Sequence, residues 1–320
     1  MTAFSTQQRL SQATFREHSA TFSTEGRRHG SYRGKAYPFL LRPDVWRENL
    51  YPELRGCAPA YFAARGVVWH RMRRHLLSSQ VCCLNFLMPF SRDPSALEAL
   101  LADVFCEAVE VLPIEGDGED AGYVGFEWIG GDHLGETVGG SRSRGANCTS
   151  ADAVVRIRRR RRVEVWLIEW KYTESYGAPL EPRGHETRRT RYSHLTCAPG
   201  GPIKNDLKLS LDDFFYEPFY QLLRQQILAH RMQATREQGA DRVGVLHLAP
   251  ASNTAFQKVT APVLRKFGGT VTEVWPQLLA DPDAFRSCTL EELFGARGHA
   301  AGPEHSKYLV ERYRFVKGVE

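Results

Sequence analysis

The sequence lacks the residue spacings that hold most structural zinc ions and nucleotide phosphates. It has seven cysteines, an odd number, and no two of them stand at the CxxC spacing of a four-ligand zinc site. It also has no HExxH pair, no GxxxxGKS or GxxxxGKT phosphate-binding loop and no nucleophile elbow. These absences predict no intrinsic ATP hydrolysis, and they predict reduced, mostly buried thiols.

Long apolar runs are also missing. No run is long enough to span a bilayer, and residues 1–16 contain no apolar signal region. We therefore expect a cytoplasmic protein with no membrane partner.

What is present is the composition of a globular protein. The 320 residues are 42% hydrophobic and 25% charged, which is enough to bury a sizeable core. Lysine and arginine number 42 against 37 acidic residues, for a formal charge of +5. A mildly basic chain is compatible with a polyanionic partner, although many unrelated proteins are equally basic.

Two parts of the chain differ in composition. Residues 1–35 are rich in Ser, Thr, Gln and Arg, and basic residues outnumber acidic ones, which predicts a flexible basic arm. Such an arm could contact a phosphate backbone or simply be a solvated terminus. Residues 36–320 show no internal repeat and no clear boundary, and we expect a single domain there.

Helical spacing and strand-like composition alternate along this second part. The predicted helices span residues 58–89, 96–109, 214–233 and 259–267. The predicted strands span residues 123–129, 151–157, 163–170 and 243–248. Residues 176–206 are predicted to be irregular, and the C-terminus to hold short helical segments. This order predicts an α/β fold with a mixed central β-sheet flanked by helices and with extra terminal helical segments.

The central pair of strands carries the residues with the clearest chemistry. Side chains alternate along a strand, so Glu169 and Lys171 project from the same face. Asp152 lies on the preceding strand, where its carboxylate can stand beside that of Glu169. Adjacent carboxylates repel each other, and a divalent cation such as Mg²⁺ relieves that cost while leaving room for water and phosphate. Lys171 can hold or activate the water, or offset charge on the phosphate. An ordinary ion pair at a strand terminus is the alternative.

These segments resemble the core signature of the PD-(D/E)xK nucleases. The resemblance is carried by Thr149 to Val155 (TSADAVV) and by Leu167 to Glu174 (LIEWKYTE), and it is closest to bacterial restriction-endonuclease-like proteins. It implies a restriction-endonuclease-like catalytic core at about 78–250, with Asp152 and Glu169 as metal ligands for Mg²⁺ or Mn²⁺ and with Lys171 as the catalytic lysine. Ala151 stands where the family signature has proline, which is not a ligand.

The same resemblance implies further site residues. Many members add another acid, for which Glu127 is the better candidate and Glu136 the second. Gln80 and Gln225 are placed to bind a substrate phosphate or to orient the lysine. Either type of residue is also common on an ordinary protein surface.

A basic run separates the two central strands. Five consecutive arginines, residues 158–162, predict a hairpin with a basic tip, which we call the arginine tip. We expect it to flank the site and to bind backbone phosphate, with Arg156, Arg158, Arg159 and Arg160 in contact with nucleic acid. A solvated hairpin tip is the alternative.

The sequence therefore predicts a metal-dependent nuclease that hydrolyses DNA phosphodiester bonds. The resemblance implies a restriction or defence setting, and a homodimer is one arrangement for cutting both strands. The alternatives are a DNA-repair or recombination nuclease, and a DNA-binding protein that no longer cuts.

Overall fold

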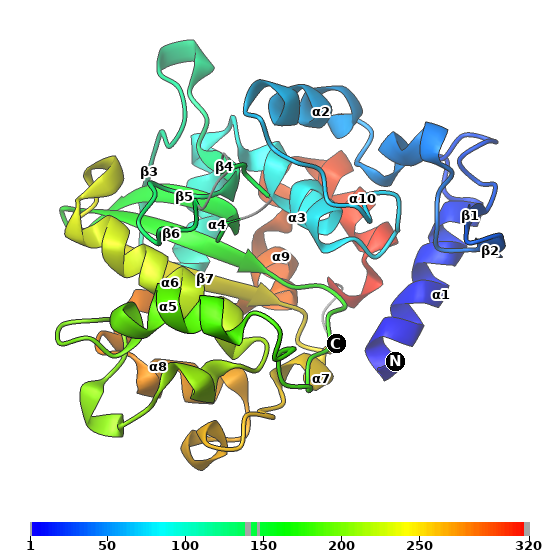
Figure 1. Ribbon diagram of the computed structural model, residues 1–320. Coiled ribbons are helices and arrows are strands. Elements are labelled where there is room, and N and C mark those ends of the chain that lie inside the picture. The colour runs from blue at the N-terminus through cyan, green and yellow to red at the C-terminus, as the bar shows by residue number, and fades with distance from the viewer. Residues whose placement is uncertain (1, 138–141, 146–147, 317–320) are drawn as a thin grey trace.

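The structure, a computed structural model, describes residues 2–137, 142–145 and 148–316 (Figure 1). Its strands are β1 (Gly30–Tyr32), β2 (Lys35–Tyr37), β3 (Glu110–Leu112), β4 (Val124–Trp128), β5 (Ala151–Arg159), β6 (Arg162–Trp170), β7 (Arg242–Ala249) and β8 (Phe285–Thr289). Its α-helices are α1 (Ala3–His18), α2 (Leu54–Ala64), α3 (Ser79–Leu87), α4 (Pro94–Phe105), α5 (His185–Thr196), α6 (Phe219–Ala234), α7 (Thr254–Gln257), α8 (Val271–Leu278), α9 (Leu290–Arg297) and α10 (Pro303–Arg312).

Within the described residues, six strands form one mixed sheet. The order is β3-β5-β6-β7-β8, and β4 also pairs with β5. The strands on the β5 side are antiparallel, whereas β6, β7 and β8 are parallel. The turn between β5 and β6 has positive φ angles at Arg160 (48°) and Arg161 (65°), which the two-residue hairpin turn requires.

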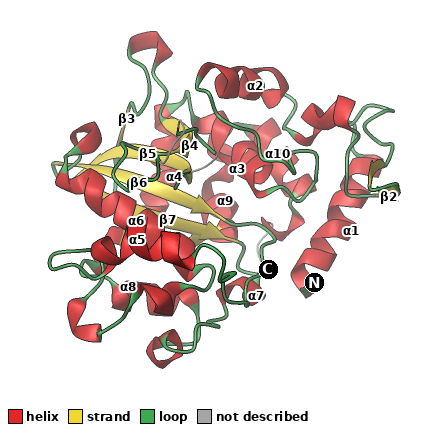
Figure 2. Ribbon diagram, viewed as in Figure 1, coloured by secondary structure: helices red, strands yellow, loops and turns green. Residues whose placement is uncertain are grey.

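Helices cover both faces of this sheet, as Figure 2 shows. One buried cluster packs Trp166 and Trp170 of β6 against α3 and α4, and the other packs Val165 and Leu167 against α6 and α8. The predicted α/β architecture, a mixed sheet flanked by helices with further terminal helices, is therefore confirmed. So is the expectation that β6 is covered on both faces, since its residues from Glu164 onward are buried.

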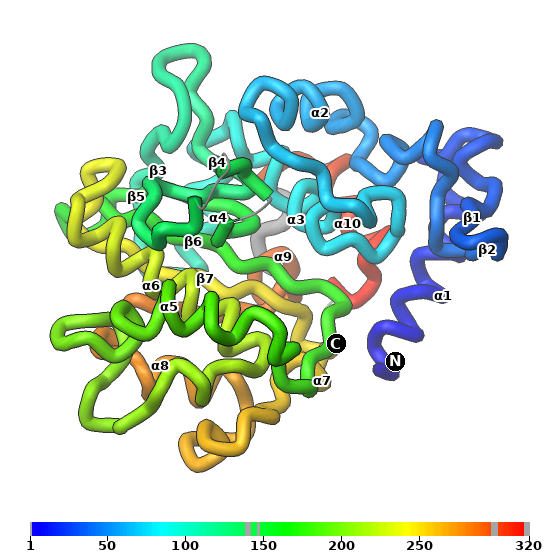
Figure 3. Tube along the Cα trace, in the orientation of Figure 1, coloured from blue at the N-terminus to red at the C-terminus, as the bar shows by residue number. Residues whose placement is uncertain are grey.

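The N-terminal residues differ from the expected flexible arm. Residues 3–18 form α1, which begins at the Thr2 cap and buries Phe4 and Phe15. Gln12 donates to the carbonyl oxygen of Arg312 (2.9 Å), so α1 is fastened to α10 at the other end of the chain. Figure 3 shows the blue N-terminal helix beside the red C-terminal segment. A buried face and distant hydrogen bonds correct the prediction of a loosely held arm.

Several predicted element boundaries were also wrong. Residues 58–89 contain the end of α2 and all of α3, with a non-helical segment between them in which Val68 is exposed. Helix α5 lies inside the segment predicted to be irregular. Of the helix predicted at 259–267, only Leu264–Phe267 is helical, as a 3-10 turn. Strands β3 and β8 were not predicted. No helix of the described residues is long and apolar enough to cross a membrane.

Candidate active site

Asp152 and Glu169 meet near the start of β5 and the end of β6. The antiparallel ladder pairs Ala153 with Ile168, which makes Asp152 and Glu169 the next opposing residues, and opposing residues project from the same face. The Asp152 carboxylate accepts a hydrogen bond from the backbone N–H of Trp170 (2.7 Å). Glu169 is 1% exposed. The strand register thus brings together the two acids that the sequence predicted.

Lys171 follows two residues after Glu169 and completes the cluster. Its ammonium group forms an ion pair with the Glu169 carboxylate and donates to Oε1 of Gln221 (2.7 Å). The other Glu169 oxygen accepts from the Gln225 amide, whose Nε2 also lies 3.3 Å from the carbonyl oxygen of Ser150. Gln221 and Gln225 lie four residues apart and so project from one face of α6. This helix therefore positions both the acid and the lysine.

Glu127 reaches the same neighbourhood from β4. Its φ angle of 51° interrupts the regular extended backbone between Phe126 and Trp128. A left-handed non-glycine residue costs about 1–3 kcal/mol and persists only where its surroundings hold it. The Glu127 carboxylate accepts from Nε2 of Gln80 (2.6 Å) and from the Ser150 hydroxyl (3.3 Å).

The charges of these groups are strongly coupled. Burial, followed by the nearby Glu169 carboxylate, raises the pKa of Asp152 well above its ordinary value. Burial also raises the pKa of Glu127, and Glu169 adds to that shift. Burial lowers the pKa of Lys171, but Glu169 and other negative groups outweigh it, so its pKa is well above the ordinary value. The fold therefore gathers three carboxyl groups in one place, where burial and the charge of Glu169 favour the protonated forms of Asp152 and Glu127.

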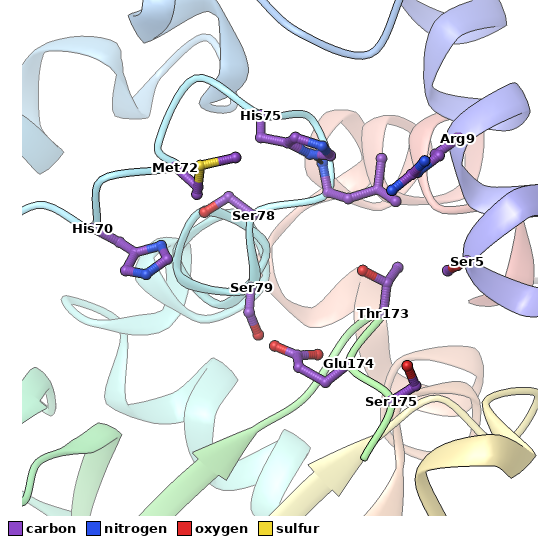
Figure 4. A pocket seen from close by; sticks show the side chains of 11 residues that line it. Ser5, Arg9, His70, Met72, His75, Ser78, Ser79, Thr173, Glu174 and Ser175 are labelled. Atoms are coloured by element: carbon purple, nitrogen blue, oxygen red, sulfur yellow. Dashed lines mark hydrogen bonds between the residues drawn. The ribbon is translucent and has the colours of Figure 1, made fainter. Parts of the chain in front are cut away.

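Two clefts are lined by residues next in sequence or in contact with members of this cluster. One, of about 520 Å³, opens between α1, the segment before α3 and the residues that follow Lys171. Figure 4 shows Thr173 and Glu174 at one wall of this cleft, with Arg9 and His75 across from them. The other cleft, of about 510 Å³, opens between α5 and α6. Neither cleft is lined by the three central side chains themselves.

A family model now places the chain among known proteins. The model described as "Restriction Endonuclease associating with ARP" matches residues 8–314. The chain belongs to this family. No curated protein and no solved structure matched the chain.

In this member of the restriction endonuclease family, Gln80 and Gln225 contact the acids. Gln80 binds Glu127 and also accepts from the backbone N–H of His70 (2.8 Å), and Gln225 binds Glu169. Both amides are buried, at 8% and 0% exposure, so they are not the surface residues of the alternative interpretation. Sequence reasoning missed Gln221, whose four-residue spacing from Gln225 was a usable signal.

The arginine tip lies at the wrong end of the hairpin to flank this cluster. Eight residues of extended strand separate Asp152 from Arg160, which corresponds to roughly 26 Å. Arg159 is 7% exposed and pairs with Glu107 and Glu164. Arg158 pairs with Glu110, and Arg160 pairs with Glu107.

Arg156 lies nearer the middle of β5. It is half-buried and donates to the carbonyl oxygen of Pro113 (3.2 Å). The expectation that these arginines surround the site was therefore wrong, because the antiparallel turn carries them away from it and nearby acids pair with the tip.

The oxygen ligands at the cluster suit a divalent cation. No group of three or more His, Cys, Asp or Glu side chains is arranged to hold a metal ion in the part of the chain that the structure describes. Mg²⁺, however, is commonly held by one or two carboxylates, with water and phosphate completing its shell. Asp152 and Glu169 provide such a pair. Burial, and after it the charge of Glu169, raises the pKa of Asp152, and a bound cation would offset both costs of its ionised form. The residues present therefore fit Mg²⁺ or Mn²⁺.

Proposed function

We propose that the protein is a metal-dependent endonuclease of the PD-(D/E)xK type that hydrolyses DNA phosphodiester bonds. The observation that carries this proposal is the convergence of Asp152, Glu169 and Lys171 on one face of the sheet. Membership of a restriction endonuclease family supports the same reaction class. A structural ion pair would need only Glu169 and Lys171, and it gives no reason for the further carboxylates of Asp152 and Glu127.

The reaction transfers a phosphoryl group from a sugar oxygen to water. The oxygen of water forms a bond to phosphorus, the bond to the leaving sugar oxygen breaks, and that oxygen takes up a proton. Asp152 and Glu169 would hold Mg²⁺ or Mn²⁺, which when bound supplies a Lewis acid for a phosphoryl oxygen.

Lys171 supplies a positive charge from the protein, in addition to that of the proposed metal ion. Its ammonium group is held by Glu169 and Gln221, so its position is fixed before substrate arrives. From there it can donate a hydrogen bond to the attacking water or to the phosphate as negative charge grows on it. Gln225 and Gln80 hold Glu169 and Glu127 in place. Glu127 adds negative charge beside the proposed cation site.

The biological setting is part of the proposal. A restriction or other defence role in the cytoplasm is consistent with the family, and a homodimer would place one site on each DNA strand. Analytical ultracentrifugation with and without DNA tests the dimer.

The proposed reaction is tested on plasmid and single-stranded DNA with Mg²⁺, with Mn²⁺ and with EDTA. We expect cutting that needs the cation and is lost in Asp152→Asn, Glu169→Gln and Lys171→Met, each of which nearly keeps the size of the side chain. Glu110→Gln, at the far end of the sheet, is the control and should cut like the wild type. Undiminished cutting in EDTA, or by the Lys171→Met protein, would reject the mechanism.

A further inference from the structure

The cleft between α5 and α6 is connected to the proposed active site through shared contacts. Arg188 and Arg191 line it from α5, and Tyr220 and Arg224 line it from α6. These two helices cover the same face of the sheet (Figure 1). Positions 188 and 191, like positions 220 and 224, lie one helical turn apart, so each pair projects toward the cleft.

The cleft and the acidic cluster share structural elements. Nη1 of Arg224 donates to the hydroxyl of Thr149 (3.2 Å), and the next residue, Ser150, contacts both Gln225 and Glu127. Arg224 also immediately precedes Gln225, the residue that binds Glu169. A strand of nucleic acid whose scissile phosphate lies at the carboxylates would therefore have its neighbouring phosphates close to this cleft.

The positive charge in the cleft lacks an ionic partner. Among the described residues, Arg188, Arg191 and Arg224 form no ion pair, whereas Arg189 on the same helix pairs with Glu186 and Asp212. The guanidinium groups of Arg188 and Arg224 both lie over the Tyr220 ring, at 5.5 and 5.0 Å from its centre. Two like charges on one ring repel each other, which an anion between them would relieve.

The one carboxylate of the cleft is already occupied. Glu136 is 7% exposed, and its oxygens accept from the backbone N–H and the hydroxyl of Thr149 and from the hydroxyl of Tyr192, each at 2.6 Å. The single charge of Glu136 faces three arginines in the lining of the cleft, which therefore keeps an excess of positive charge. Within the described part of the chain, Nε of Arg224 is buried without a hydrogen-bond partner.

We infer that the α5–α6 cleft binds backbone phosphates of the DNA strand beside the bond that is cut, with Arg188, Arg191 and Arg224 as the contacts. Arginine suits this role because its planar group donates two parallel hydrogen bonds to phosphate. The inference rests on the proposed nuclease function for its substrate. The proposed phosphate-binding surface is therefore on α5 and α6 and not, as the sequence predicted, at the arginine tip.

The test compares two double variants that each remove two positive charges. DNA binding is measured by fluorescence anisotropy with a short duplex in EDTA, over a range of salt concentrations. Arg188→Gln/Arg191→Gln should weaken binding roughly tenfold or more. It should also reduce, by about 2, the steepness with which the logarithm of the binding constant falls against the logarithm of the salt concentration. The control, Arg158→Gln/Arg160→Gln at the arginine tip, should change affinity less than about threefold, because its charges are already paired.

Further measurements separate misfolding from lost contacts. Arg188→Lys/Arg191→Lys keeps the charge and should retain most of the salt slope, and thermal unfolding checks that all variants fold. Equal losses at the cleft and at the tip, or wild-type affinity in Arg188→Gln/Arg191→Gln, would overturn the inference. If the wild type cuts DNA but Arg188→Gln/Arg191→Gln binds DNA normally, the inference about the cleft fails and the nuclease function stands. Cleft-dependent binding without any cutting by the wild type would reject the nuclease function alone.

Discussion

The β5–β6 hairpin carries charged residues at both ends. They are paired with opposite charges at one end, whereas acids are buried together at the other. At the arginine tip, Arg158, Arg159 and Arg160 each pair with a nearby acid. At the other end, Asp152, Glu169 and Glu127 come together, Lys171 pairs with Glu169, and burial raises the pKa of Asp152 and of Glu127. The comparison teaches that a dense run of charge in the sequence can be neutralised locally, whereas buried acids that the fold brings together have perturbed pKa values and mark the candidate site.

The largest effect on stability is expected at the arginine tip. Arg159→Met would leave the buried Glu164 without its arginine, because Arg159 contacts that carboxylate through two nitrogens. Removing one partner of a buried ion pair destabilises by about 3–5 kcal/mol. Urea unfolding measures this loss. The matched control, Arg158→Met, removes an exposed pair and should cost less than about 1 kcal/mol. Equal stabilities of the two variants would show that the buried pair of Arg159 and Glu164 does not stabilise the fold.

The next largest effect is expected on cutting, at Glu127. Glu127→Gln keeps a hydrogen-bond acceptor for Gln80 but removes a negative charge beside the proposed cation site. Groups that support metal ligands typically contribute about 10–100-fold to metal affinity or activity. The cleavage rate should therefore fall by that factor at limiting Mg²⁺, with less loss at high Mg²⁺. Glu119→Gln, in an exposed 3-10 turn, is the control. A Glu127→Gln rate equal to that of the control would remove Glu127 from the site.

Within about one pH unit below the ordinary histidine pKa, a smaller effect on stability is expected through His247, which opposes Glu169 in the β6–β7 ladder. Burial, with a contribution from Lys171, lowers the pKa of His247 to about 3. The unfolded chain takes up this proton near pH 6.5, whereas the folded protein does not. Stability is therefore full above that pH and falls by about 1.4 kcal/mol per pH unit as the pH drops toward the folded value.

Urea unfolding at several pH values measures this slope. The stability of His247→Gln should fall less steeply with decreasing pH than that of the wild type. Some of the decrease should remain, because burial also lowers the pKa of His75, to about 4. An identical pH dependence in the wild type and in His247→Gln would contradict the prediction.

The smallest predicted effect has the opposite sign. The pKa of Asp152 is raised in the folded state, so its contribution to stability is present below the ordinary pKa and is lost as the pH rises through the raised value. At neutral pH in EDTA, Asp152→Asn should stabilise the protein by on the order of 1 kcal/mol, while its cutting is abolished. Calorimetric unfolding of the two proteins measures the gain. A less stable Asp152→Asn protein would show that the carboxylates are not repelling one another.

The sequence was sufficient to predict the strands that carry the central acids. Segments around Val155 and Leu167 are rich in β-branched and apolar residues, and this local pattern fixes both the strand and the side to which Glu169 and Lys171 point. The helix that holds them was also predicted, because α6 has apolar residues at helical spacing. The site could therefore be expected from local pattern and alternation.

Features that depend on distant partners could not be read from the sequence. Helix α1 is held by Gln12 and Arg312, which are 300 residues apart. Helix α5 is largely polar and buries only Tyr192 and Thr196, so it gave no apolar periodicity. The partners of the arginine tip, Glu107 and Glu110, lie about fifty residues before it. Each of these features depends on tertiary contacts that local composition does not encode.

One measurement tests the central claim most directly, because it makes the same chemical change at both ends of the hairpin. Asp152→Asn/Glu169→Gln and Glu107→Gln/Glu110→Gln each convert two carboxylates to amides, and plasmid cleavage is measured with Mg²⁺. The first variant should lose cleavage by on the order of 1,000-fold or more, whereas the second should cut within about threefold of the wild type. Wild-type cutting by Asp152→Asn/Glu169→Gln would contradict the account.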